Sequence, residues 1–155
     1  MKRFLIVGTA LAAVTAATLF GVTSVATAEK GGKSDLSALK NATARFHDVD
    51  KAVATGRVDL GLCVDQMGQH YANPQTFDHT VDPLDPEAMV YADDGKGHLK
   101  LVAVEWVATD PNQAVMGHEL HFNPAVGVYV LHAWIWAPNP VDTWADMNPR
   151  IGDCP

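Results

Sequence analysis

The chain has 155 residues, 48% of them hydrophobic, and its 18 acidic and 11 basic side chains give a net charge of −7. No basic patch is evident that could attract phosphate backbones, which argues against nucleic acid as a partner. The length suits one domain with a real core and is too short for two ordinary domains.

The first 28 residues have the pattern of a secretion signal. Basic residues at the start precede an apolar run over residues 4–20, and an Ala-Thr-Ala sequence at 26–28 supplies a cleavage site. We expect residues 1–28 to be a signal peptide and residues 29–155 a single secreted domain with no stable membrane anchor. A retained anchor is the alternative, and the glycines and threonines within the run disfavour it.

Cys63 and Cys154 are the two cysteines, and both lie in the part expected to be exported. An even pair in a small secreted domain usually forms a disulfide. We therefore predict a Cys63–Cys154 bond. The alternative, a thiolate metal or redox site, lacks the usual CxxC spacing.

Apolar residues recur at spacings of three and four over residues 34–56 and predict one amphipathic helix lying on a sheet face. Ser34 is expected to cap its start and Gly56 to end it. The apolar positions are Leu36, Leu39, Phe46, Val49 and Val53.

Residues 63–87 are rich in Gly, Asn, Asp and Pro and predict a long ordered loop. So long a connection in a compact domain is often functional. Its Cys63 end would be tied to the C-terminus by the disulfide.

Four strands in two hairpins are predicted beyond this loop. Residues 88–92 and 98–108 flank an Asp-Asp-Gly-Lys-Gly turn, and residues 115–122 and 128–137 flank a five-residue Pro/Gly turn. A helix followed by two hairpins indicates an α+β domain with an antiparallel sheet of about four strands.

The second hairpin concentrates histidine. If its strands pair symmetrically about the turn, Phe122 opposes Val128, and His118 then opposes His132. Two imidazoles this close could bind one metal ion or share a proton. His121 would point to the other face unless a bulge or an early strand end redirects it.

The same alternation adds Trp134 and Trp136 to the face of His132. By default these indoles are core packing. The alternative is a ligand-binding platform, which would need exposed indole faces.

Glu105 is an acid in an otherwise apolar strand, on the predicted face of Leu99, Leu101 and Ala103. A buried carboxylate should be protonated, hydrogen-bonded, or joined to a histidine or a metal. The alternative is a sheet edge, where it merely reaches water. His70, in the predicted loop, is a candidate to complete such a site.

Recognised catalytic motifs are missing. The stretch at 118–121, His-Glu-Leu-His, is one residue short of HExxH and lies in a predicted strand, whereas that motif requires a helix. There is no GxSxG, Gly-rich phosphate loop or catalytic cysteine pattern. The sequence therefore leaves open whether the domain is an enzyme.

Three segments resemble a group of small, secreted, functionally uncharacterised bacterial proteins. They are HYANP at 70–74, VDPLDPEAMVY at 81–91, and LHAWIWAPNP with the later WADMNP and CP at 131–155. The resemblance implies a single exported domain and no particular activity. His70 and His132 occupy positions in these motifs, which favours a functional role for both.

Two main hypotheses follow for the function. The first is a metal site formed by some of His70, His118, His121 and His132, with Glu105; imidazoles without thiolate suit zinc or copper. The second is a metal-free domain that binds an extracellular small molecule, glycan or protein through Trp134 and Trp136. A metal-independent enzyme using a histidine and Glu105 as acid and base is a third alternative.

Overall fold

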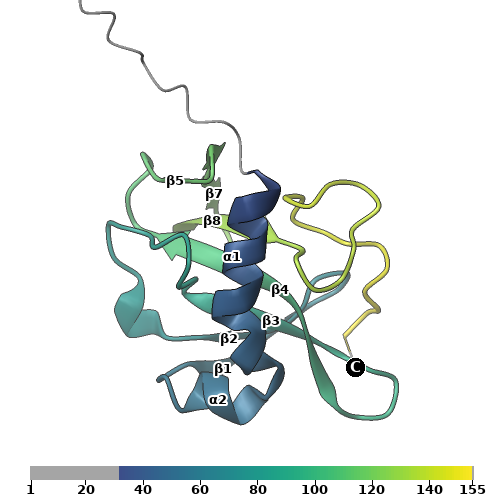
Figure 1. Cartoon of the computed structure of the whole chain (residues 1–155). Helices are drawn as coiled ribbons and strands as arrows, with labels where there is room; N and C mark the ends of the chain where they lie inside the picture. Colours follow the sequence, from purple (N-terminus) through teal and green to yellow (C-terminus); the bar gives the residue numbers. More distant parts are fainter. Residues whose placement is uncertain (1–31, 155) are drawn as a thin grey trace, which may run out of the picture.

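The computed structural model describes residues 32–154, so the expected signal peptide lies outside the described residues. It combines an N-terminal helix with a six-stranded antiparallel sheet and a separate two-stranded hairpin (Figure 1). The predicted α+β class is confirmed, with more strands than the sequence indicated. Within residues 32–154, no helix is both long and apolar enough to cross a membrane.

The helical region has three segments in place of one continuous helix. They are α1 (Lys33–Thr43), a 3-10 turn (Ala44–His47) and α2 (Val49–Val53). The break falls at Asp48, which is extended and whose carboxylate accepts a hydrogen bond from the Asp50 amide at the start of α2. An Asp in this position favours a new helix start over continuation of the preceding helix.

The helical region ends where predicted but begins at a different capping residue. Gly32, not Ser34, is the N-cap of α1, and its amide donates to the Asp35 carboxylate. Gly56 follows α2 with a φ of +87°, as predicted for the end. Of the predicted apolar stripe, Leu39 and Phe46 are buried against the sheet and Leu36 and Val49 partly so, whereas the prediction is wrong for Val53, which is 48% exposed. The Tyr91 hydroxyl donates to the Phe46 carbonyl oxygen at 2.7 Å.

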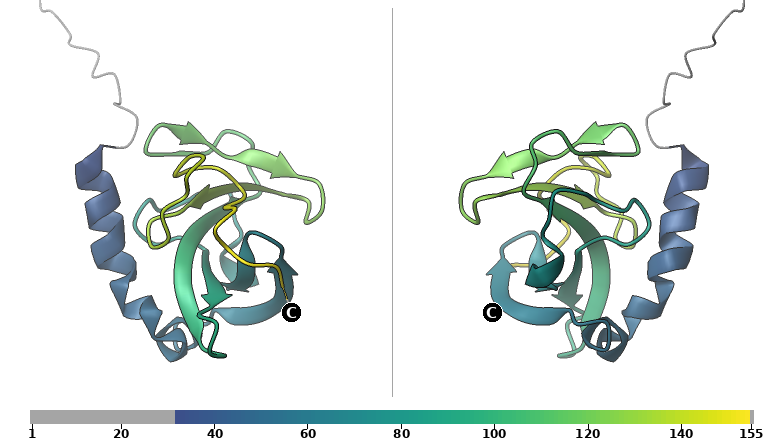
Figure 2. Two further views of the ribbon diagram at one scale, coloured as in Figure 1. Left: turned by 90° about the vertical axis from the view of Figure 1, so that its right-hand side faces the viewer. Right: turned by 90° about the vertical axis from the view of Figure 1, so that its left-hand side faces the viewer.

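The main sheet is curled into a half-barrel, with α1 standing to one side of it (Figure 2). Each strand pairs antiparallel with its neighbours. The spatial order is β1 (Val58–Val64), β2 (Gly68–Ala72), β3 (Ala88–Asp93), β4 (Leu99–Ala108), β8 (Val128–Ala133) and β7 (His121–Asn123). The separate hairpin pairs β5 (Ala114–Val115) with β6 (His118–Glu119).

The prediction of a continuous loop over residues 63–87 is wrong in its first part, because β1 and β2 form a hairpin there. Gly68 explains the error. It lies on β2 with a φ of +115°, and a Cβ at this position would collide with the carbonyl oxygen of Tyr91. This glycine thus permits a close approach of strands and does not mark a loop.

The disulfide prediction is confirmed. Cys63 on β1 is bonded to Cys154, with 5.9 Å between their Cα atoms. The bond ties the C-terminal segment to one edge of the sheet.

A β-bulge in β4 changes which residues share a face. Leu101 and Ala103 pair with consecutive residues of β3, so Val102 is one extra residue. Leu101 consequently packs in the apolar cluster under α1, whereas Ala103 packs in a second cluster with Trp134. The predicted common face for Leu99, Leu101, Ala103 and Glu105 is therefore wrong for Leu99 and Leu101, which lie beyond the bulge.

Candidate metal centre

Strand register brings Glu105 and His132 together. Glu105 of β4 pairs directly with His132 of β8, and on its other side with Ala88 of β3. Ala88 in turn pairs with Ala72 of β2, two residues beyond His70. Paired residues share a face of a sheet, so these side chains all project to the same side.

His70, Glu105 and His132 form a buried cluster. The distance from His132 Nε2 to Glu105 Oε1 is 3.5 Å, and from His70 Nε2 to Glu105 Oε2 it is 3.6 Å. One ligand atom from each residue lies within 4.8 Å of the other two. The residues are only 3%, 7% and 1% exposed, respectively. Of the alternatives for Glu105, the structure shows a buried carboxylate beside two histidines, and the sheet-edge alternative is wrong.

Local hydrogen bonding orients His70. Its Nδ1 lies 3.1 Å from the carbonyl oxygen of Leu62. A carbonyl oxygen only accepts, so Nδ1 carries the proton and Nε2 presents its lone pair toward Glu105. Burial lowers the pKa of His70, against the opposing effect of Glu105, and this favours the neutral ring that a metal ion requires.

Neither ring nitrogen of His132 has a hydrogen-bond partner among the described residues. The nearest carboxylate oxygens lie 3.5 Å away on Glu105 and 3.8 Å away on Asp146, beyond hydrogen-bond distance. Burial alone lowers the pKa of His132, but the two carboxylates outweigh it and raise that pKa above its ordinary value. A buried imidazole with both nitrogens unpartnered is costly unless something else binds it.

The cluster fits a transition-metal ion. Ligand atoms around a tetrahedral ion with bonds of about 2.1 Å stand about 3.4 Å apart. The two nitrogen–oxygen separations of 3.6 and 3.5 Å run to different oxygens of Glu105, and the three ligand atoms lie within 4.8 Å of one another, so small side-chain shifts would bring them to bonding distance of one ion. Two imidazoles and one carboxylate also form a ligand set typical of catalytic zinc sites. Both thiols of the chain are in the disulfide and offer no competing soft site.

An apolar cavity of about 310 Å³ adjoins the cluster, and His70 and Glu105 are part of its lining. Its other walls come from all six strands of the main sheet, from the turn before β8, and from Phe77 and Met147 outside the strands. They include Leu60, Leu62, Val64, Met67, Ala72, Phe77, Ala88, Val107, Val126, Val128, Val130 and Met147.

The predicted opposition of His118 and His132 is wrong. Phe122 pairs with Tyr129, not Val128, and β7 begins at His121, which pairs with Val130, so no residue of this strand pairs with His132. His118 belongs to β6 in the separate hairpin, where its ring stacks on Trp144 with 4.1 Å between ring centroids.

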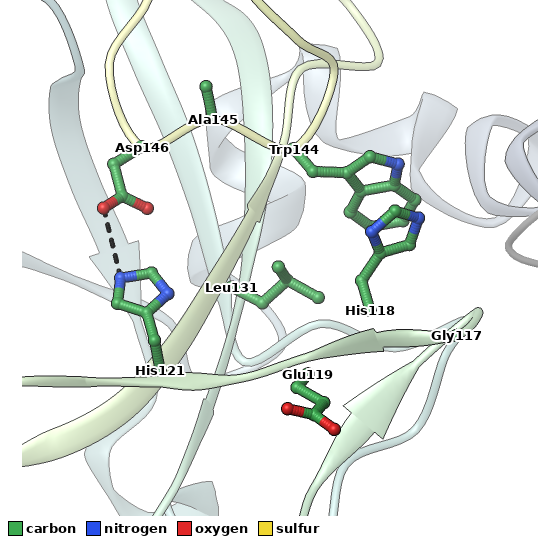
Figure 3. A pocket seen from close by; sticks show the side chains of 8 residues that line it. All are labelled: Gly117, His118, Glu119, His121, Leu131, Trp144, Ala145 and Asp146. Atoms are coloured by element: carbon green, nitrogen blue, oxygen red, sulfur yellow. Dashed lines mark ion pairs between the residues drawn. The ribbon is translucent and has the colours of Figure 1, made fainter.

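His121 does not point away from His132, because both rings approach one carboxylate. His121 Nε2 lies 3.1 Å from Asp146 Oδ2, and His132 Nδ1 lies 3.8 Å from Asp146 Oδ1. Figure 3 shows the first of these ion pairs, with Trp144 and His118 stacked further along the same pocket. The pKa of Asp146 is lowered, chiefly by His132 and also by His121.

Asp146 is the functional candidate that the sequence analysis missed. It lies in the irregular C-terminal segment, and neither periodicity nor motif spacing distinguishes it from neighbouring acids. Only the folded chain brings this segment against β8.

Trp134 and Trp136 do not form the predicted common face. Trp134 is 3% exposed and packs in the second cluster, with Ala103. Its ring plane makes an angle of 15° with that of His132. Trp136 packs with the cluster under α1, where its indole donates to the Thr43 hydroxyl. The regular strand ends at Ala133, so alternation does not continue through both indoles.

No protein-family model, curated protein or solved structure matches the chain.

Proposed function

We propose that this protein is a secreted domain that binds one transition-metal ion, zinc or copper, through His70, Glu105 and His132. The observation that carries the proposal is the convergence of three buried ligand atoms within 4.8 Å, at an imidazole that has no other hydrogen-bond partner among residues 32–154. His118 and His121 are not included among the ligands.

The donor set supports this choice of ion. Two nitrogens and a carboxylate suit zinc or copper, whereas magnesium and calcium favour sites built from oxygen ligands. Secretion is the prediction from the leader pattern, and the disulfide agrees with an oxidising compartment.

Three protein ligands leave room in the coordination shell. A zinc ion held this way can polarise a bound water or a substrate oxygen, whereas a fourth protein ligand would make the ion structural. The cavity beside His70 and Glu105 favours an ion that contacts a small molecule.

The metal-free hypothesis has less support. A ligand platform needs exposed indole faces, whereas Trp134 is only 3% exposed and Trp136 is partly buried against the cluster under α1.

Metal analysis of the purified protein and calorimetric titration with zinc and copper test the proposal. We expect about one equivalent of tightly bound ion in the wild type and its loss in His132→Ala and His70→Ala. His98→Ala is the matched control, because that side chain is 77% exposed and pairs only with Asp94 among described residues. Absence of binding by the wild type, or equal binding by wild type and His132→Ala, would refute the proposal.

A further inference from the structure

We infer that the cavity beside the metal centre binds a small, largely apolar molecule that carries one carboxylate group. The inference rests on the proposed metal site and adds a ligand class to it. Its observations are the chemistry of the cavity wall, the placement of two buried polar side chains in that wall, and the size of the space.

The wall is predominantly apolar, and apolar residues continue to its rim. Leu60, Leu62, Val126 and Met147 line the cavity and are 37–47% exposed. Exposed apolar side chains gathered around one cavity favour an apolar ligand. Burying an apolar chain among them would also remove these side chains from water.

Polar contacts within the cavity are confined to few atoms. His70 and Glu105 are the charged or ionisable side chains in its lining, and both are more than nine-tenths buried. Asn123 is the other polar residue, and its side-chain oxygen already accepts from the Ala125 amide. The polar group of a ligand should therefore lie at the metal centre, with its apolar part toward the rim.

Small residues create the space next to the ligands. Ala72 and Ala88 stand beside Glu105 in one row across three strands, and both line the cavity. Larger side chains here would fill the region adjoining the carboxylate. The resulting volume of about 310 Å³ is at the small end of the range for small-molecule sites.

Charge selects the head group. A divalent ion held by two neutral imidazoles and one carboxylate retains a net positive charge, which a second carboxylate would balance. An uncharged head, such as an alcohol, would leave that charge unpaired in an apolar cavity. A medium-chain fatty acid has both required parts.

Calorimetric titration of the zinc-loaded protein with butanoate, hexanoate and octanoate tests the inference, after excess zinc has been removed. Affinity should rise about fourfold for each added methylene until the chain fills the cavity. Octanol should bind the zinc-loaded protein at least about tenfold more weakly than octanoate does. Octanoate should likewise bind the metal-free protein at least about tenfold more weakly than the zinc-loaded protein.

Two variants with matched controls locate the binding. Val126→Asp puts a negative charge at the rim and should weaken octanoate binding about tenfold, whereas Val141→Asp, at an exposed valine outside the cavity, should not. Ala88→Leu should abolish octanoate binding through lost space. If Ala88→Leu fails to fold, the pair of surface variants still decides the outcome.

Zinc stoichiometry, measured on the same samples, separates the two proposals. Zinc binding without octanoate binding, or with equal octanoate binding by wild type and Val126→Asp, overturns the cavity inference and leaves the metal proposal standing. Octanoate binding that is equally tight with and without zinc overturns the role of the ion in holding the head group. Absence of zinc binding overturns the proposed function and this inference with it.

Discussion

Glu105 and His132 lie directly opposite each other on neighbouring strands, with 3.5 Å between Oε1 and Nε2 and both side chains buried. At this depth the carboxylate is a major influence on the charge of the ring. The strand register therefore sets the distance between the carboxylate and the ring, and with it the pKa of His132 and the geometry of the proposed metal site.

Replacing Glu105 by Gln should lower the pKa of His132 in the metal-free protein. Burial already opposes protonation of this ring, and the variant removes one of the two carboxylates that outweigh burial. Imidazole ¹⁵N NMR across a pH titration measures the change. Zinc affinity should fall as well, since a ligand is lost, and Glu119→Gln at an exposed acid is the control. An unchanged His132 pKa would contradict the assigned cause.

Zinc affinity should decrease as the pH falls, beginning above pH 6.5. The ion and a proton compete for His132, whose pKa is raised above that ordinary value, so the proton wins earlier than at an average histidine. Below the raised pKa, affinity should fall about tenfold per pH unit for one displaced proton. Calorimetry in several buffers at each pH gives both affinity and proton release. A flat profile between pH 5 and about 8 would argue against histidine ligation.

Replacing Asp146 by Asn should weaken zinc binding by about tenfold or more, because the negative charge of the carboxylate, 3.8 Å from His132 Nδ1, increases the basicity of this metal-binding ring. Competition with a chromogenic chelator measures the affinity. Asp142→Asn is the control, since it lies in the same segment and its side chain can still accept from the Trp144 amide. Equal loss in both variants would indicate a general effect on the segment.

Replacing Glu87 by Gln should increase stability at alkaline pH. Glu87 is 7% exposed, and burial raises its pKa to about 7 from 4.5. Its contribution to stability is therefore fully present below pH 4.5 and is lost as the pH rises through about 7. Relative to wild type, the variant should gain roughly 2–3 kcal/mol in free energy of unfolding between pH 5 and pH 8.5. The amide oxygen of Gln can still accept from Val107, whose amide lies 2.9 Å from the carboxylate.

Urea denaturation at the two pH values measures this change. Glu119→Gln should show no comparable pH dependence, because Glu119 is exposed. A constant difference between Glu87→Gln and wild type at both pH values would show that Glu87 titrates normally.

Removing the disulfide in a Cys63→Ser, Cys154→Ser double variant should lower the free energy of unfolding by about 4–5 kcal/mol in the chain-entropy model. The bond closes a loop with a sequence separation of 91 residues. Urea denaturation of both proteins gives the difference. Reductant should destabilise the wild type and leave the variant unchanged; a difference below about 1 kcal/mol would mean that the reduced chain retains the same constraint.

Part of the site could be predicted from residue chemistry. Glu105 stands out as an acid in an apolar strand, whereas His70 and His132 were favoured only by a resemblance that no comparison supports. Burial of polar groups constrains their partners strongly, so a histidine could be named among the possible partners of Glu105 without knowledge of the topology. Asp146, on an irregular segment, gave no such signal.

The strand register could not be predicted because a single turn residue decides it. Asn123 pairs with Val128, and its backbone oxygen accepts from Val126 and Gly127, so the turn has one residue fewer than loop symmetry suggested. A register change of one residue alters every cross-strand pair. The alternation of apolar and polar residues also does not predict the bulge at Val102, because a bulge depends on contacts between strands.

The order of strands leaves β1 and β7 as the two edges of the main sheet. A long, regular edge is a template on which another chain can add a strand. β7 has only three residues, and the pairing of β1 is irregular between Asp59 and Cys63, where Gly61 has a φ of +63°. Neither edge offers an uninterrupted row of amides and carbonyls, so concentrated solutions of the protein should resist strand-to-strand aggregation from either side.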